Sequence, residues 1–216
     1  MAKTSTRFCI VRHGETDWNA EQRIQGQRDL PLNAEGILQA HKLGCYFASR
    51  TLDAIYSSDL IRAHATAEPI AETQKLPIHP LRQLRERAYG RCEGMTRSEV
   101  ALNYPEDARA MHERRPDYVI PNGESLNRHR ERVLDCVTDL ARLHDGQTVL
   151  LVTHGGVLDL IYRKASEMPI ESPRNFQIPN AGINWMIVDD GGWRVTRWAE
   201  TSHLESSAPS EVHMYF

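Results

Sequence analysis

Short apolar runs recur along the chain and are separated by longer amphipathic segments. Three runs rich in β-branched and apolar residues predict buried strands at Phe8–Val11, Leu52–Tyr56 and Thr148–Val152. The third run is continuous, as expected of a strand that helices cover on both faces. Two further runs, 183–188 and 193–198, flank the sequence Asp-Asp-Gly-Gly and predict a β-hairpin.

Between these runs, apolar residues recur at the spacing of an α-helix. The pattern predicts helices at Asn33–Arg50, Asp59–Thr73, Gly123–Leu143 and Gly156–Ser166. Asp59 is placed to cap the second of them, a type of residue favoured at helix N-termini. Strands that alternate with helices indicate an α/β fold, and we expect a three-layer α/β/α sandwich with a mostly parallel central sheet.

The stretch from about residue 76 to residue 122 breaks this alternation. It contains five of the eleven prolines and many arginines. We expect it to form a small, mainly helical cap inserted into a single domain that spans residues 1–216. Such a cap would cover one end of the sheet.

Composition and charge exclude several kinds of partner. The net charge is −3 and no block of lysine and arginine occurs, so neither nucleic acid nor a membrane surface is an expected partner. The first residues, MAKTSTRF, lack the apolar core of a signal peptide, and no apolar run is long enough to span a membrane. The four cysteines are widely spaced, which is typical of reduced thiols. We therefore expect a cytoplasmic protein.

Two histidines directly follow predicted strands. His13 comes after Phe-Cys-Ile-Val-Arg, and His154 comes after Val-Leu-Leu-Val-Thr. Ligands of open α/β sheets bind at the carboxyl ends of the strands, so two histidines at two such ends are expected to meet in one pocket. A lone histidine in either place would more simply be an interior residue, but two in equivalent positions favour a functional site.

Five segments, in order along the chain, resemble the histidine phosphatase superfamily, the phosphoglycerate-mutase-like fold. They are VRHGETDWN at 11–19, QGQRDLPL at 25–32, YSSDLIRA at 56–63, LRERAYG at 84–90 with Glu93-Gly94 after it, and THGG at 153–156. The resemblance covers nearly the whole chain. Five segments in the correct order are far more specific than an isolated Arg-His-Gly.

The resemblance implies a nucleophilic histidine, His13, and a phosphohistidine intermediate. A dianionic phosphomonoester repels an anionic nucleophile, whereas a neutral imidazole avoids that repulsion. One ring nitrogen attacks phosphorus, so the other must be held as N–H, and we expect a backbone carbonyl to accept this hydrogen bond. Arg12 and Arg62 are expected to clamp the phosphoryl oxygens. A protonated His154 is expected to add positive charge there.

The leaving group also needs a proton, and Glu86 matches the family position for this acid. Glu86 would then take a proton from the water that hydrolyses the phosphohistidine. Glu15 is the competing carboxylate, but the family pattern gives its position a structural role.

Further positions are expected to contact the substrate because they match family positions or carry positive charge in the cap. These residues are Asn19, Gln25, Gly26, Gly155, Arg87, Tyr89, Arg97, Arg114 and Arg115. Asn19 could equally be a turn residue or helix cap, and the arginines could be a solvated face. The ten histidines show neither the HxH nor the HExxH spacing, so we expect no metal and no other cofactor.

The superfamily contains both phosphatases and mutases. The short connection from Arg114-Arg115 to Gly123, and Gly155-Gly156 after the second histidine, resemble the phosphatase branch. We therefore expect a phosphatase that acts on a small, acidic phosphorylated metabolite, as a monomer or homodimer. The alternative is a phosphoglycerate mutase that requires 2,3-bisphosphoglycerate as a primer. A third reading is a module that binds phosphorylated ligands without turnover.

Overall fold

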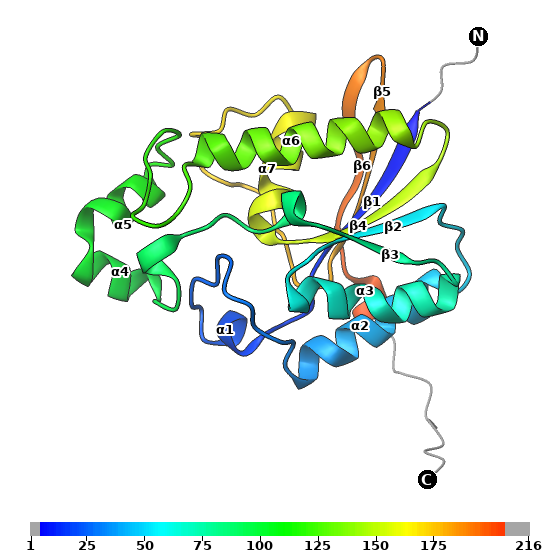
Figure 1. Ribbon diagram of the computed structural model, residues 1–216, viewed down its shortest axis with the longest axis horizontal. Coiled ribbons are helices and arrows are strands. Elements are labelled where there is room, and N and C mark those ends of the chain that lie inside the picture. Colours follow the sequence, from blue (N-terminus) through cyan, green and yellow to red (C-terminus); the bar gives the residue numbers. More distant parts are fainter. Residues whose placement is uncertain (1–4, 206–216) are drawn as a thin grey trace.

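The core of the protein is a six-stranded sheet with the order β3-β2-β4-β1-β5-β6 (Figure 1). The computed structural model describes residues 5–205, so the two ends of the predicted domain, 1–4 and 206–216, lie outside the described residues. The strands are β1 (Thr6–Arg12), β2 (Ala54–Ser58), β3 (Ile78–Leu81), β4 (Thr148–Thr153), β5 (Ile183–Asp189) and β6 (Gly192–Glu200). The first four run parallel, and β5 runs antiparallel to its two neighbours, β1 and β6, which confirms the expected mostly parallel sheet and the hairpin.

Alternating side chains of β1 enter two separate hydrophobic cores. Phe8 and Ile10 pack on one face of the sheet, and Cys9 and Val11 pack on the other. All four are fully buried. Because successive side chains of a strand point to opposite faces, an unbroken apolar run needs a layer of helices on each side.

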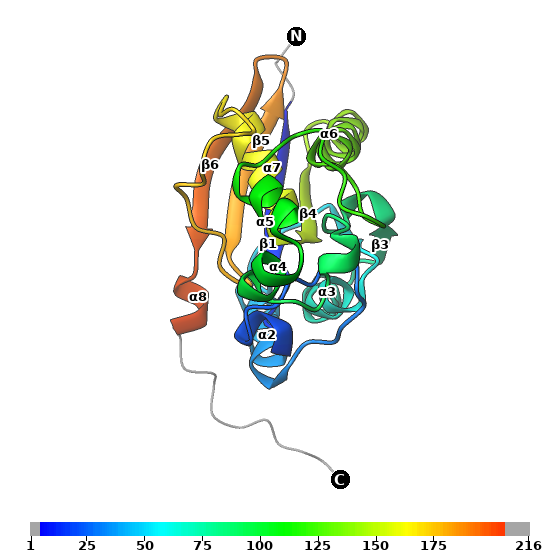
Figure 2. The same ribbon diagram turned by 90° about the vertical axis from the view of Figure 1, so that its left-hand side faces the viewer.

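The two helical layers confirm the predicted three-layer sandwich (Figures 1 and 2). Helices α6 (Leu126–Leu143) and α7 (Gly155–Ala165) supply apolar side chains to the core that contains Phe8. Helices α2 (Ala34–Phe47) and α3 (Ile61–Gln74) supply the core that contains Cys9. The short helix α8 (Ser202–Glu205) lies against α2.

The segment that follows β3 forms a separate small layer at one end of the sheet. It contains the 3-10 helices η1 (Arg82–Leu84) and η2 (Gly90–Cys92) and the helices α4 (Arg97–Asn103) and α5 (Pro105–His112). Figure 2 looks onto α4 and α5 from this end. Cys92, Val100 and Ile120 form a small core of their own beneath these helices.

Two details of the sequence-based prediction are wrong. Residues 78–81 form β3, the edge strand beside β2, so they belong to the sheet and not to the cap. Asp59 does not cap α3, because Leu60 occupies the cap position without a side-chain hydrogen bond. Asp59 instead forms an ion pair with Arg85 at 2.6 Å, while Asp29 accepts the hydrogen bond from the Ile61 N–H.

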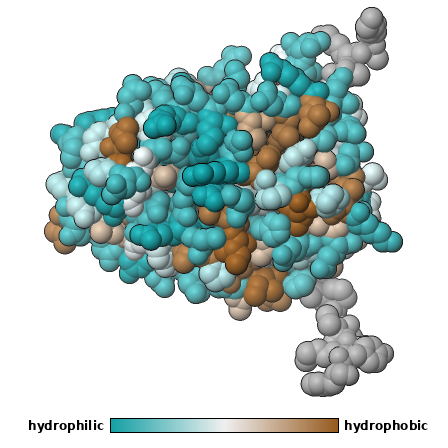
Figure 3. Space-filling model, in the orientation of Figure 1, coloured by the Kyte–Doolittle hydropathy of each residue, from teal (hydrophilic) through white to brown (hydrophobic). Residues whose placement is uncertain are grey.

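Residues 14–33, which link β1 to α2, contain the short helix α1 (Asp17–Ala20), which the apolar pattern did not predict. Thr16 and Asn19 cap it reciprocally. Within residues 5–205, no helix has the length and apolar character needed to cross a membrane. Figure 3 shows mostly hydrophilic side chains on one face, interrupted by hydrophobic patches.

We expect Leu151→Ala in β4 to lower the free energy of unfolding by about 3 kcal/mol, because Leu151 is fully buried and the substitution leaves a cavity. The same substitution at Leu102 of α4, which is 83% exposed, should change it by less than about 0.5 kcal/mol. Urea denaturation of both variants measures the difference. Equal losses would contradict the two-core arrangement.

Candidate active site

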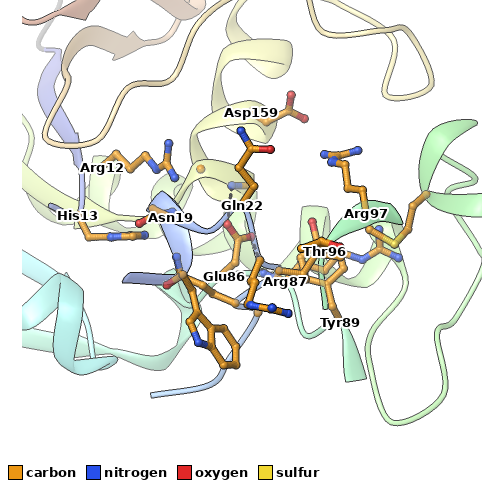
Figure 4. Close-up of a pocket in the computed structure, with 18 of the residues that line it drawn as sticks. Arg12, His13, Asn19, Gln22, Glu86, Arg87, Tyr89, Thr96, Arg97 and Asp159 are labelled. Atoms are coloured by element: carbon orange, nitrogen blue, oxygen red, sulfur yellow. Dashed lines mark hydrogen bonds between the residues drawn. The ribbon is translucent and has the colours of Figure 1, made fainter. Parts of the chain in front are cut away.

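The two histidines predicted to meet do so at the carboxyl ends of β1 and β4. These strands are parallel neighbours, and Arg12 pairs with Thr153 in the register. His13 and His154 follow these two residues directly, and their ring centroids lie 5.1 Å apart. His13 lines a cavity of about 660 Å³ (Figure 4), whereas His154 is not among the residues that line it.

His13 has the geometry of a neutral nucleophile. Its Nδ1 lies 2.7 Å from the carbonyl oxygen of Gly14. A carbonyl only accepts, so Nδ1 carries the proton and Nε2 is left with its lone pair. This confirms the expected backbone acceptor. Burial, followed by the charges of Arg62 and Arg12, lowers the pKa of His13 well below its usual value, so the ring is neutral at physiological pH.

Two arginines flank the histidines, Arg62 fully buried and Arg12 partly exposed. Arg62 donates to the carbonyls of Gly26 at 2.8 Å and Arg28 at 2.7 Å, and Arg12 donates to the carbonyl of Ile178 at 2.7 Å. Burial lowers the pKa of each guanidinium to about 10, so both remain cationic at neutral pH. Neither arginine forms an ion pair with a carboxylate within residues 5–205, which leaves positive charge for an anion in the cavity.

The surroundings of His154 favour its neutral form, and its protonation beside a phosphoryl group stays a prediction. Burial, followed by the charges of Arg62, His13 and Arg12, lowers its pKa well below the usual value. Its Nε2 lies 2.8 Å from Ser58 Oγ, and Oγ also accepts from the Leu60 N–H. Ser58 can therefore donate its hydroxyl proton to Nε2, which would place the ring N–H on Nδ1.

Glu86 is held in the same cavity by two backbone donors. One carboxylate oxygen accepts from the Arg87 N–H at 2.7 Å and the other accepts from the Gly156 N–H at 2.7 Å. The second donor belongs to the first turn of α7, where a carboxylate is favoured by the helix dipole. Glu15, the competing carboxylate, lies outside the cavity and accepts from the Asn33 side chain.

Most of the predicted substrate contacts line the cavity. These residues are Asn19, Gln25, Gly26, Gly155, Arg87, Tyr89, Arg97 and Arg114. Asn19 is also a helix cap, since its Oδ1 accepts from Thr16. Arg115 is not among the lining residues and pairs with Glu106 and Glu113 near the surface, so its prediction as a substrate contact is wrong.

The cap arginines differ in how firmly they are held. Arg87 donates to the carbonyls of Glu124 and Tyr118, and Arg114 donates to Asp159. Arg97 makes no hydrogen bond or ion pair with any residue in the range 5–205, and it points into the cavity (Figure 4).

The sequence interpretation missed three residues of the site. Arg174, in the loop between α7 and β5, lines the cavity, and its charge acts on Arg12. Ser58 ends β2 beside His154, and His129 of α6 lines the cavity. The position of Ser58 at the end of a strand, inside a recognised segment, was a usable signal. Arg174 and His129 lie among polar residues that look like solvated surface.

The site as a whole fits a phosphoryl group. It combines a neutral imidazole, two cations and a carboxyl group that faces the same space. Among residues 5–205, no group of three histidine, cysteine or acidic side chains is arranged to hold a metal ion.

The buried histidines predict a fall in stability at mildly acidic pH. The pKa values of His13, His129 and His154 are lowered in the folded protein, so below about pH 6.5 the unfolded chain binds protons that the folded chain does not. The free energy of unfolding should be highest above that pH and fall as the pH drops, by up to about 1.4 kcal/mol per pH unit for each histidine.

Urea denaturation between pH 5 and pH 7.5 measures this effect, in a range above the titration of ordinary carboxyl groups. His154→Gln should show a shallower slope than the wild type. Equal stability at pH 5 and pH 7.5 would contradict the burial of neutral histidines.

Comparison with known proteins agrees with this geometry. Residues 8–201 match the family model of the histidine phosphatase superfamily, branch 1. The chain is 38% identical over 209 residues to phosphoglycerate mutase-like protein 4 of Arabidopsis thaliana, covering 93% of this chain and 87% of that protein. It is 37% identical over 204 residues to the metal-independent phosphoserine phosphatase of the same plant, covering 93% of this chain and 84% of that protein.

A solved structure is similarly close. The phosphoserine phosphatase of Entamoeba histolytica in complex with 3-phosphoglyceric acid superposes with a TM-score of 0.83 at 30% identity, covering 92% of this chain and 99% of that one. The family match, these relatives and the paired histidines together show that the chain belongs to the histidine phosphatase superfamily.

Proposed function

We propose that the protein is a phosphatase that hydrolyses small, acidic phosphomonoesters through a phosphohistidine on His13. The observation that carries this proposal is the tautomer of His13. The Gly14 carbonyl holds Nδ1 as N–H and leaves Nε2 as the nucleophile, next to Arg12 and Arg62. Relatives named as phosphatases support the reaction class.

In the first step, His13 Nε2 attacks phosphorus, and the bond from phosphorus to the leaving oxygen breaks. Arg12 and Arg62 stabilise the phosphoryl oxygens, and the proposed His154 Nδ1–H adds a further donor. Protonated Glu86 gives its proton to the leaving oxygen. In the second step, water attacks the phosphohistidine, Glu86 takes a proton from that water, and phosphate leaves with His13 neutral again.

Positive charge at the cap side of the cavity supports an acidic leaving group. Arg97 and Arg174 make no hydrogen bond or ion pair with the part of the chain that the structure describes, and both line the cavity. Arg87 and Arg114 are fixed beside them by the bonds described above. A carboxylate on the leaving group would supply the missing partner for such side chains. The complex of the Entamoeba histolytica enzyme with 3-phosphoglyceric acid is consistent with a ligand of this class.

A paired assay with His13→Ala tests the proposal and separates it from the mutase alternative, which the name of the 38% identical relative favours. Without metal, we expect the wild type to release phosphate from p-nitrophenyl phosphate and 3-phosphoglycerate. His13→Ala should lose at least about 1000-fold in kcat/KM, because the nucleophile is gone. Rapid quenching with labelled substrate should trap an acid-labile phosphoryl group on the wild type only.

The second arm follows conversion of 3- to 2-phosphoglycerate with catalytic 2,3-bisphosphoglycerate. Efficient isomerisation with little phosphate release would establish the mutase instead. No turnover of any phosphomonoester, with ligand affinity retained in His13→Ala, would establish a binding module.

Arg97→Ala should weaken selection of the acidic substrate. We expect kcat/KM for 3-phosphoglycerate to fall about 10- to 100-fold, as for loss of a charged hydrogen bond, while p-nitrophenyl phosphate changes by less than about 3-fold. Arg115→Ala is the matched control, since Arg115 pairs with glutamates outside the cavity. If Arg97→Ala lowered both substrates equally, or neither, the carboxylate role would be wrong.

A further inference from the structure

Helix α6 brings a third buried histidine to the cavity. His129 lies in the first turns of α6, lines the cavity, and is 1% exposed. Neither the sequence pattern nor the reaction steps above give it a role. Its surroundings point to one.

The ring of His129 is neutral, with a free acceptor nitrogen. The Arg85 carbonyl accepts a hydrogen bond from the ring. Nε2 is buried and has no partner, so the proton is on Nδ1 and Nε2 carries a lone pair. Burial, followed by the charges of Arg132 and Arg87, lowers the pKa of His129 well below its usual value.

Glu86 and His129 meet above Gly156. A Cβ atom added to Gly156 would lie 2.1 Å from Glu86 Oε1 and 3.1 Å from His129 Cε1. The carboxyl group and the edge of the imidazole next to Nε2 therefore converge on one point. Glycine at this position leaves room for both, while its N–H donates to Glu86.

The other ionisable groups near His129 already have hydrogen-bond partners. Arg132 donates to the backbone carbonyls of residues 83, 85 and 86 and to Glu124. Arg87 donates to the Glu124 and Tyr118 carbonyls, and His154 is bonded through Nε2 to Ser58. Glu86 is the group beside His129 that must carry a proton in the proposed reaction.

We propose that His129 is a positioning residue whose Nε2 accepts a hydrogen bond from protonated Glu86 and holds the proton on this acid until the leaving group takes it. This inference rests on the proposed phosphatase function. Both carboxyl oxygens of Glu86 accept from backbone N–H groups, so a proton on Glu86 needs a separate acceptor for its O–H. His129 Nε2, which has no other partner within residues 5–205, supplies that acceptor.

The proton balance follows the two reaction steps. On formation of the phosphohistidine, the O–H bond of Glu86 breaks and an O–H bond forms on the leaving oxygen. When water attacks, its proton returns to Glu86, and the hydrogen bond to His129 is restored. His129 itself stays neutral throughout.

A pair of substrates with different leaving groups tests this role. p-Nitrophenolate leaves without a proton, whereas the alkoxide of 3-phosphoglycerate needs one. In His129→Leu, we expect kcat/KM for 3-phosphoglycerate to fall about 10- to 100-fold and that for p-nitrophenyl phosphate by less than about 3-fold. The basic limb of the pH profile with 3-phosphoglycerate should move to lower pH by about one unit. His129→Gln, which keeps an acceptor near the ε position, should restore most of the rate.

His144→Leu is the control, because His144 follows the opposite end of α6, where it bonds to Tyr56. It should leave both rates unchanged. If His129→Leu no longer unfolds cooperatively on heating, His129→Asn takes its place, because the asparagine side chain is too short to reach Glu86. Equal loss on both substrates without a pH shift, or no rescue by glutamine, would overturn the role of His129. Failure of the wild type to release phosphate from either substrate would instead overturn the proposed function.

Discussion

The parallel pairing of β1 with β4 is the constraint on which the site depends. Because the two strands run in register, the residues after them emerge side by side at one edge of the sheet. His13 and His154, separated by 140 positions in the chain, are thereby held with ring centroids 5.1 Å apart. The pairing is fixed by two cores, one on each face, so neither histidine can move without disturbing packed side chains.

Within residues 5–205, Arg12 and Arg62 form no ion pair with a carboxylate, so positive charge is concentrated at this end of the site. Arg62 is fully buried, yet its side chain donates to the carbonyls of Gly26 and Arg28. Carbonyl oxygens satisfy the N–H donors and fix the guanidinium, but they leave its charge in place. A carboxylate partner would have cancelled the attraction for a phosphoryl group. Burial, together with this charge, lowers the pKa of His13 and of His154, so one arrangement would both attract the anion and keep the proposed nucleophile neutral.

The sequence predicted well the end of the site where the phosphoryl group is expected to bind, because the residues at that end belong to short contiguous segments. His13 and His154 directly follow β1 and β4, and Arg62 lies in the first turn of α3, so each motif coincides with the end of a strand or the start of a helix. The cap end was predicted less well. Arg115 and Arg114 are neighbours in sequence, but Arg114 has a positive φ of 53°, and only Arg114 reaches the cavity.

Two other residues were misplaced or missed for the same reason, because contacts between distant segments determine where their side chains lie. Asp59 looked like a helix cap, but a tertiary ion pair with Arg85 takes its carboxylate. Arg174 lies in an irregular loop, where no periodicity predicts the direction of a side chain. Phe176 stacks on Tyr162 with ring centroids 3.8 Å apart and so anchors this loop to α7. Aromatic packing between distant segments therefore places a residue that local sequence could not.

The division between the two ends of the cavity carries a functional consequence. The ends of β1 and β4 and the start of α3 supply the groups that would contact the phosphoryl oxygens, and the pairing of β1 with β4 holds the two histidines in place. The cap and the loop that carries Arg174 supply the groups near the leaving group, and these come from short helices and irregular segments. Changes in the second set can alter which phosphomonoester is chosen without altering how phosphorus is attacked. Relatives that share this fold can accordingly bear the names of both phosphatases and mutases. Glu86, His129 and Gly156 lie together where the proposed acid, which accepts from the first turn of α7, would face the leaving group.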